Sequence, residues 1–300
     1  MNINNRYEWA SAKLQNGRLL FDTIDGFNRA VKDGFFFIKA PDTLNLSSGD
    51  LFATNFYLPK TGNSYDAYRD FKSWTADKLA EREGYFLRNA DQVEQFFLEH
   101  QFWKNVFPLS LATQAIQMKE FGLEVLRATL SQLDIPAKLW DKATGGCLSG
   151  LGTYHLTFNH FRPTVRSRGL NIHKDSGWVT ILRSLEPGLE ILREGEWLPI
   201  IPRPDTFIVN FGCAMEILTR NATIPVAAVA HRVVEQKPRE QSGVDRFSYA
   251  LFIDSSLDKN VSEGLYSYKY GKGLVLETSF EEFLNKILHN TYEQHTQGLY

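Results

Sequence analysis

Residues 154–161, with the sequence Tyr-His-Leu-Thr-Phe-Asn-His-Phe, open the part of the chain whose pattern decides the fold. From here on, short runs rich in β-branched and aromatic residues alternate with turn residues, which is typical of strands. We predict eight strands, near 154–161, 169–173, 178–182, 189–192, 197–200, 206–210, 231–235 and 246–253. Eight short strands at this spacing indicate a sandwich, a barrel or a jelly roll, and they disfavour a parallel α/β sheet.

The chain before residue 150 has a different pattern, which favours helices. Apolar residues at helical spacing predict helices over 20–31, 90–103 and 111–133, and a short buried strand is expected at 34–38. Near the C-terminus, Ser279-Phe280-Glu281-Glu282 has the form of a capping box, so a helix should run toward Tyr292. We therefore expect one domain over 1–300: a mainly helical part at 1–150, a β-core at 151–256 and a C-terminal extension with a helix at 257–300.

The composition is that of an ordinary globular protein. The 300 residues are 43% hydrophobic and 23% charged, with a formal net charge of −2. This balance argues against nucleic-acid binding through a basic surface, and no apolar run predicts a membrane span. Cys147 and Cys213 are expected to be reduced core thiols. The N-terminal residues lack the apolar segment of a signal peptide, so we expect a cytoplasmic protein.

His173, Asp175 and His231 form the pattern that carries chemistry. His173 and Asp175 are two positions apart, so on a strand both side chains point to the same side. Two imidazoles and one carboxylate leave three positions open on a metal, a geometry that suits non-haem Fe(II) oxygenases. A single histidine is more often a core or surface residue than a metal ligand. We expect this for His100, His289 and His295.

Arg246 and Ser248 strengthen this hypothesis, because they share one face of the last predicted strand. An arginine that points into a barrel needs an anionic partner, since leaving it unpaired is costly. A dicarboxylate bound to iron at one end would present its other carboxylate to Arg246, with the hydroxyl of Ser248 assisting. The alternative for Arg246 alone is a surface position paired with Asp245 or Glu240.

These motifs together resemble the 2-oxoglutarate/Fe(II) oxygenases of the isopenicillin N synthase-like superfamily. The resemblance is strongest over 154–254 and includes the segments 188–199 and 207–212, with a weaker similarity at 34–36. It implies a double-stranded β-helix, or jelly-roll, core with flanking helices. It also implies that His173, Asp175 and His231 are iron ligands. Arg246 and Ser248 would anchor the distal carboxylate of 2-oxoglutarate.

Two positions depart from the family pattern. Asn159-His160-Phe161 stands where members often carry Asn-Tyr-Tyr, so Asn159 can still reach the co-substrate but Phe161 has no hydroxyl to donate. The strand that ends in Gly-Asp in the family ends here in Gly212-Cys213. These departures leave open an isopenicillin N synthase-like Fe(II) oxidase that does not use 2-oxoglutarate. A non-catalytic binding module is a third hypothesis, which the intact ligand set disfavours.

The resemblance implies an oxidoreductase, a dioxygenase that uses Fe(II), 2-oxoglutarate and O2 to hydroxylate, desaturate or cyclise a small molecule. Bacterial secondary or amino-acid metabolism is the expected setting. Strand parity directs Thr157, Asn159 and Phe161 toward the pocket and His160 away from it. Phe211 is a further candidate for substrate contact. The substrate and the oligomeric state are left open at this point.

Overall fold

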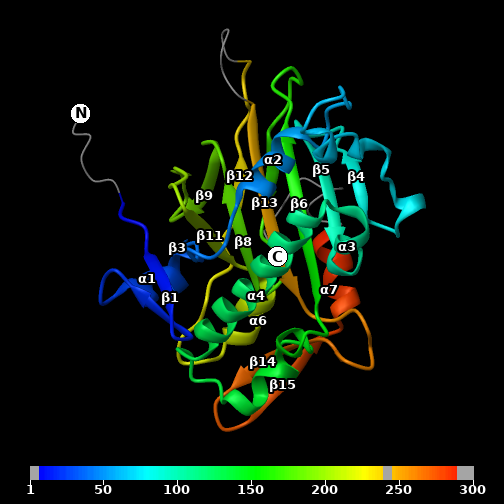
Figure 1. Cartoon of the computed structure of the whole chain (residues 1–300). Helices are drawn as coiled ribbons and strands as arrows, with labels where there is room; N and C mark the ends of the chain where they lie inside the picture. Colours follow the sequence, from blue (N-terminus) through cyan, green and yellow to red (C-terminus); the bar gives the residue numbers. More distant parts are fainter. Residues whose placement is uncertain (1–6, 239–244, 289–300) are drawn as a thin grey trace, which may run out of the picture.

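The computed structural model describes residues 7–238 and 245–288, and two sheets form its centre (Figure 1). The larger sheet has nine strands in the order β2-β1-β3-β11-β8-β13-β6-β5-β4. In chain order its strands are β1 (Ser11–Gln15), β2 (Arg18–Phe21), β3 (Phe35–Lys39), β4 (Gly84–Leu87), β5 (Val93–Glu99), β6 (Thr153–Phe161), β8 (Val179–Ser184), β11 (Thr206–Phe211) and β13 (Arg246–Asp254).

A smaller sheet has four strands in the order β10-β9-β12-β7. These strands are β7 (Leu170–His173), β9 (Leu189–Arg193), β10 (Glu196–Ile200) and β12 (His231–Val233). The eight strands predicted after residue 150 are therefore confirmed, with ends that shift by one or two residues. From β6 to β13, the strands of the larger and the smaller sheet enclose a cavity between them.

β13 illustrates why alternating residues specify this arrangement. Its even-numbered residues, from Arg246 to Asp254, line the cavity, whereas Phe247, Tyr249 and Leu251 enter the main hydrophobic core on the other face. Because successive side chains of a strand point to opposite faces, one strand supplies both surfaces. β13 pairs with β6 so that Arg246 lies opposite Phe161 and Asp254 lies opposite Thr153.

Helices cover the face of the large sheet that lies away from the cavity (Figure 1). α4 (Leu109–Leu130) is the longest, as predicted, and it contacts β8 and β13. Gly122 permits this close approach, because a Cβ atom there would lie 2.5 Å from Cδ1 of Ile253. The other helices with α-helical geometry are α1 (Gly26–Asp33), α2 (Ser47–Asn55), α3 (Trp103–Val106), α5 (Trp140–Ala143), α6 (Cys213–Thr219) and α7 (Phe280–Leu288).

Three predictions about the N-terminal part need correction. The helix expected over 90–103 is wrong, because β5 forms there and pairs along its whole length with β6. The helix expected from residue 20 begins only at Gly26, since β2 continues to Phe21. Residues 1–150 are also less purely helical than expected, because five strands of the large sheet come from this part. For β5, pairing with the distant strand β6 overrides the local pattern, and β2 is held by its hairpin with β1.

The C-terminal part begins with a two-stranded ribbon of β14 (Leu265–Lys269) and β15 (Gly273–Thr278). The capping box before α7 is confirmed: the backbone N–H of Glu282 donates to Oγ of Ser279 at 3.2 Å, and the N–H of Ser279 donates to Oε2 of Glu282 at 3.4 Å. The predicted end of this helix near Tyr292 lies outside the described residues, as do His289 and His295.

Cys147 and Cys213 are both buried and unbonded to one another, as expected. Within the described residues, no helix combines the length and the apolar character needed to cross a membrane.

Candidate metal centre and cavity

His173, Asp175 and His231 come together at one side of the cavity. β7 and β12 pair so that His173 lies directly opposite His231. The ligand atoms of the three residues all lie within 4.8 Å of one another. Oδ1 of Asp175 is 3.8 Å from Nε2 of His173 and 3.7 Å from Nε2 of His231. One difference from the sequence argument is that β7 ends at His173, so Asp175 is held by the following loop.

Hydrogen bonds orient each member of this cluster. Nδ1 of His173 lies 2.8 Å from the carbonyl oxygen of Asn171, and Nδ1 of His231 lies 3.1 Å from that of Val229. Because a carbonyl only accepts, each Nδ1 carries the hydrogen, and each Nε2 keeps a lone pair directed at the cluster. Burial, followed by the nearby His231, lowers the pKa of His173, which favours the neutral form that binds metals.

Asp175, the carboxylate of the cluster, is held by Asn210 on β11, whose Nδ2 donates a hydrogen bond to Oδ2 of Asp175 at 3.3 Å. Lys174 lies between His173 and Asp175 in the sequence. Its ammonium group forms an ion pair with Glu216, with Nζ 3.0 Å from Oε2. The cluster therefore presents two imidazole nitrogens and one carboxylate oxygen toward the cavity. This is a donor set that suits a divalent transition metal such as Fe(II).

Arg246 is buried beneath the other end of the cavity, with 2% of its surface exposed. Its guanidinium lies over the ring of Phe161 at 4.4 Å, and Nη2 donates to Oγ of Ser184 at 3.2 Å. Nε and Nη1 are buried and have no hydrogen-bond partner among the described residues. Burial lowers the pKa of Arg246 to about 10, and attraction to Glu186 offsets only part of this effect.

The alternative, in which Arg246 lies at the surface and pairs with Asp245, is wrong, because Arg246 is buried. Oδ2 of Asp245 instead lies 2.9 Å from Nε2 of His160. Glu240 lies outside the described residues. A buried cation that lines a cavity and has two nitrogen donors without a hydrogen-bond partner among the described residues is costly. The site is therefore suited to an anionic ligand with two acceptor oxygens.

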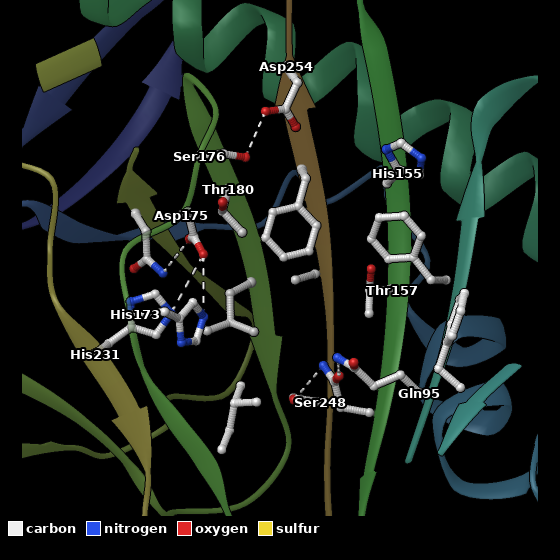
Figure 2. Close-up of a pocket in the computed structure, with 18 of the residues that line it drawn as sticks. Gln95, His155, Thr157, His173, Asp175, Ser176, Thr180, His231, Ser248 and Asp254 are labelled. Carbon is white, nitrogen blue, oxygen red and sulfur yellow. Dashed lines mark hydrogen bonds and ion pairs between the residues drawn. The ribbon is translucent and has the colours of Figure 1, made fainter. Parts of the chain in front are cut away.

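A chain of polar side chains runs beside Arg246 across three strands. Nε2 of Gln95 donates to Oδ1 of Asn159 at 2.7 Å, and Nδ2 of Asn159 lies 3.3 Å from Oγ of Ser248 (Figure 2). Sequence reasoning found Asn159 and Ser248 but missed Gln95, because residues 90–103 were expected to be helical. Once β5 is known to be a strand beside β6, its register places Gln95 opposite Asn159.

The cavity has a volume of about 560 Å³ and is lined by both the metal cluster and Arg246. Thr157, Asn159 and Phe161 all line it, and His160 faces the other side of the sheet, as strand parity predicts. Phe211 does not line the cavity. It is 1% exposed and packs 5.7 Å from the ring of Phe36, because Asn210 occupies the cavity face of β11.

Sequence reasoning also missed His155 and Asp254, which the same parity argument would have found. His155 shares its face of β6 with Thr157, and Asp254 shares its face of β13 with Ser248. Both lie at the end of the cavity away from Ser248 and Gln95 (Figure 2). Asp254 is 8% exposed, and burial raises its pKa to about 6.

Comparisons with known proteins agree with this geometry. A family model described as the 2OG-Fe(II) oxygenase superfamily matches residues 153–255. The curated 1-aminocyclopropane-1-carboxylate oxidase 1 of Doritaenopsis sp. is 27% identical over 205 residues, covering 64% of this chain and 59% of that protein. Thebaine 6-O-demethylase of Papaver somniferum is 36% identical over 112 residues, covering 36% of this chain and 29% of that protein. The chain thus spans less than two thirds of the length of these relatives.

A solved structure, that of JOX2 in complex with 2OG, Fe and JA, shares the fold. It aligns with a TM-score of 0.66 at 20% identity, covering 91% of this chain and 82% of that one. The segment matched by the family model contains the three cluster residues together with Arg246 and Ser248. Residues 153–255 of this chain are therefore similar in sequence to the 2OG-Fe(II) oxygenase superfamily.

Proposed function

We propose that this chain is a non-haem Fe(II), 2-oxoglutarate-dependent oxygenase that oxidises a C–H bond of a small molecule. The outcome would be hydroxylation, desaturation or ring closure. The proposed core is a double-stranded β-helix. Two strand orders support it: β11-β8-β13-β6 inside the large sheet and β10-β9-β12-β7 in the small one. Apart from the β9–β10 hairpin, successive strands from β6 to β13 alternate between the two sheets.

The observation that carries this proposal is one cavity that holds both the metal-type cluster and an unsatisfied buried cation. His173, Asp175 and His231 would hold Fe(II), because two neutral imidazoles and one carboxylate match its preferences and leave positions open. Nε and Nη1 of Arg246 would bind the distal carboxylate of 2-oxoglutarate. Fe(II), 2-oxoglutarate and O2 together supply the oxidising chemistry, which the protein itself does not provide.

The residues of the chain have three tasks in this function. Asn171 and Val229 hold the imidazole tautomers through their carbonyl groups, so that both Nε2 atoms stay available. Phe161 supports the guanidinium plane of Arg246 and excludes water from it. Gln95 fixes the amide of Asn159, which points its Nδ2 toward Ser248 and the proposed co-substrate.

An anaerobic titration tests the proposal. Adding Fe(II) and then 2-oxoglutarate to the purified chain is expected to produce a visible charge-transfer band. Admitting O2 with a metabolite library should then release succinate. Absence of the band together with O2-dependent oxidation of a substrate would favour the 2-oxoglutarate-independent oxidase, for which the missing hydroxyl at Phe161 is the supporting observation. Absence of both would favour a binding module.

A further inference from the structure

The cavity has opposite electrostatic character at its two ends, and β13 runs from one to the other. Its cavity-facing residues are Arg246, Ser248, Ala250, Phe252 and Asp254. Asp254 lies eight positions after Arg246 on this strand, which corresponds to roughly 26 Å between their Cα atoms. Figure 2 shows Asp254, Ser176 and His155 at one end, Ser248 and Gln95 at the other, and the metal cluster beside the space between.

Asp254 is a buried carboxylate without a countercharge. Its Oδ1 accepts a hydrogen bond from Oγ of Ser176 at 3.1 Å, and among the described residues it has no ion-pair partner. An ionised carboxylate that is buried and unpaired is costly, so its presence in a cavity wall indicates a ligand that offsets the cost. The raised pKa of Asp254, caused by burial, has the same physical origin.

The neighbouring side chains complete a polar and aromatic subsite. His155 lines the cavity, its Nε2 lies 2.9 Å from Oε1 of Glu83, and its ring stacks on Phe97 at 4.2 Å. Thr157, on the same face of β6, is 2% exposed, and its Oγ1 has no hydrogen-bond partner among the described residues. Phe97 and Phe252 form an apolar wall between these polar groups.

The cations that line the cavity do not neutralise this end. Arg88 is hydrogen-bonded to Gln95, which belongs to the Arg246 end. Lys174 is paired with Glu216. Arg82 contacts Glu81 at the protein surface, where their side chains are 57% and 90% exposed. His155 lies 2.9 Å from Oε1 of Glu83, and its attraction lowers the pKa of Asp254 by less than burial raises it. The space around Asp254 therefore keeps a negative electrostatic character.

From this arrangement we infer that the chain binds a substrate that carries a protonated amine, with Asp254 accepting its hydrogen bonds and Phe97 and Phe252 packing against its apolar body. Thr157 provides a further polar contact. This inference rests on the proposed function in one respect: 2-oxoglutarate would occupy the Arg246 end, which leaves the Asp254 end for the substrate.

An ammonium is favoured over a neutral group of the same size for two reasons. It donates charge-assisted hydrogen bonds to the carboxylate, which are about twice as strong as neutral ones. Its charge also removes the cost of the unpaired buried anion. An anionic substrate group would be repelled from the same position.

The test uses 3-phenylpropylamine and 3-phenylpropan-1-ol as probes, because they differ only in the charged group. Binding to the full chain is measured at pH 7.5 by ligand-observed NMR, first without metal and then with Fe(II) and 2-oxoglutarate under anaerobic conditions. The amine is expected to bind roughly 10- to 100-fold more tightly than the alcohol, as a charged hydrogen bond allows. Equal binding of both probes, or binding of neither, would overturn the inference.

Asp254→Asn, which keeps the shape and removes the charge, should abolish the preference for the amine. Ser176→Ala is the matched control, because it removes the hydrogen bond to Asp254 but leaves the carboxylate, and it should keep the preference. If Asp254→Asn retained the preference, or lost iron while the probes bound as before, Asp254 would be a positioning residue of the metal loop and the inference would be wrong. The wild-type comparison needs no variant, so it stands if Asp254→Asn fails to fold.

Failure of this inference can be told apart from failure of the proposed function. A chain that prefers the amine but forms no complex with Fe(II) and 2-oxoglutarate would contradict the proposed function and keep the amine subsite. A chain that forms that complex and binds both probes equally would contradict the amine subsite and keep the proposed function.

Discussion

Histidines on the two sides of the large sheet, one on the sheet itself and two on the smaller sheet across the cavity, differ in how their ring nitrogens are used. On the face away from the cavity, the ring of His160 stacks against Tyr57 and Phe247, with Nδ1 2.7 Å from Glu94 and Nε2 2.9 Å from Asp245. On the cavity side, His173 and His231 each use Nδ1 in a bond to a backbone carbonyl and leave Nε2 available. The first arrangement is complete within the protein, whereas the second leaves one nitrogen of each ring available for the proposed metal ion.

Buried carboxylates show the same contrast. Burial alone would raise the pKa of Glu94, but hydrogen bonds from His160, Tyr85 and Lys72 lower it to about 2. Burial raises the pKa of Asp254 to about 6, because attraction to His155 and the hydrogen bond from Ser176 offset only part of its effect. Satisfied polar groups on one face stabilise the fold, and unsatisfied ones on the other face are available for ligands. Hydrogen-bond and charge satisfaction therefore distinguishes structural residues from proposed functional residues of the same chemical type.

Replacing one histidine from each face should give the largest difference. His231→Ala removes a ligand, so Fe(II) binding and turnover should fall by more than the roughly 10- to 100-fold that changes around a ligand produce. His160→Ala should keep iron and lose stability, because it removes one of the hydrogen bonds that hold the buried Glu94. Metal content and denaturant unfolding measure the two effects. Full activity in His231→Ala would refute its assignment as a ligand.

Arg246→Met tests the unsatisfied cation. The affinity for 2-oxoglutarate should fall by roughly a hundredfold or more, since removing one partner of a buried charged contact costs about 2–5 kcal/mol. The empty protein should be as stable as the wild type or more stable, because an unpaired buried charge is replaced by an apolar chain. Anaerobic titration and denaturant unfolding are the measurements. Equal weakening of iron and 2-oxoglutarate binding would count against the proposed role.

The two carboxylates should give pH dependences of opposite sign. The folded-state pKa of Glu94 lies below its ordinary value of 4.5, so its stabilisation is present above about pH 4.5 and is lost as the pH falls toward 2. The pKa of Asp254 lies above its ordinary value of 3.8, so its contribution is present below that value and is lost as the pH rises through about 6.

At pH 8, Glu94→Gln should therefore destabilise the metal-free protein by about 1–3 kcal/mol, and Asp254→Asn should stabilise it by a similar amount. Denaturant unfolding at pH 4 and pH 8 measures both variants against the wild type. A loss of stability in both variants at pH 8 would contradict the distinction between the two faces.

The smallest effect is expected at Phe211, which packs in the core rather than in the cavity wall. Phe211→Leu should lower the free energy of unfolding by about 1 kcal/mol, because a buried ring is replaced by a smaller apolar side chain. The KM for any substrate should stay unchanged. A change in KM without a change in stability would return Phe211 to the list of substrate contacts.

The strands of the core were predictable because each alternates between two environments. In β13 the alternation of Arg246, Ser248 and Ala250 with Phe247 and Tyr249 is visible in the sequence, and it marks one face as polar. β5 was not predictable, because Val93, Phe96 and Phe97 also fit the spacing of a helix. Pairing with β6, whose sequence begins more than 50 residues later, decides that this segment is a strand.

The sequence by itself determined the strand pattern of residues 153–254 and the identity of the proposed ligands, because both depend on residue type and on spacing along the chain. Only the tertiary structure decided that His231 keeps a free nitrogen, that Arg246 lacks a partner and that Asp254 lies at the opposite end of the same cavity. The physical reason is that hydrogen-bond satisfaction depends on contacts between strands far apart in the chain, which local periodicity does not contain.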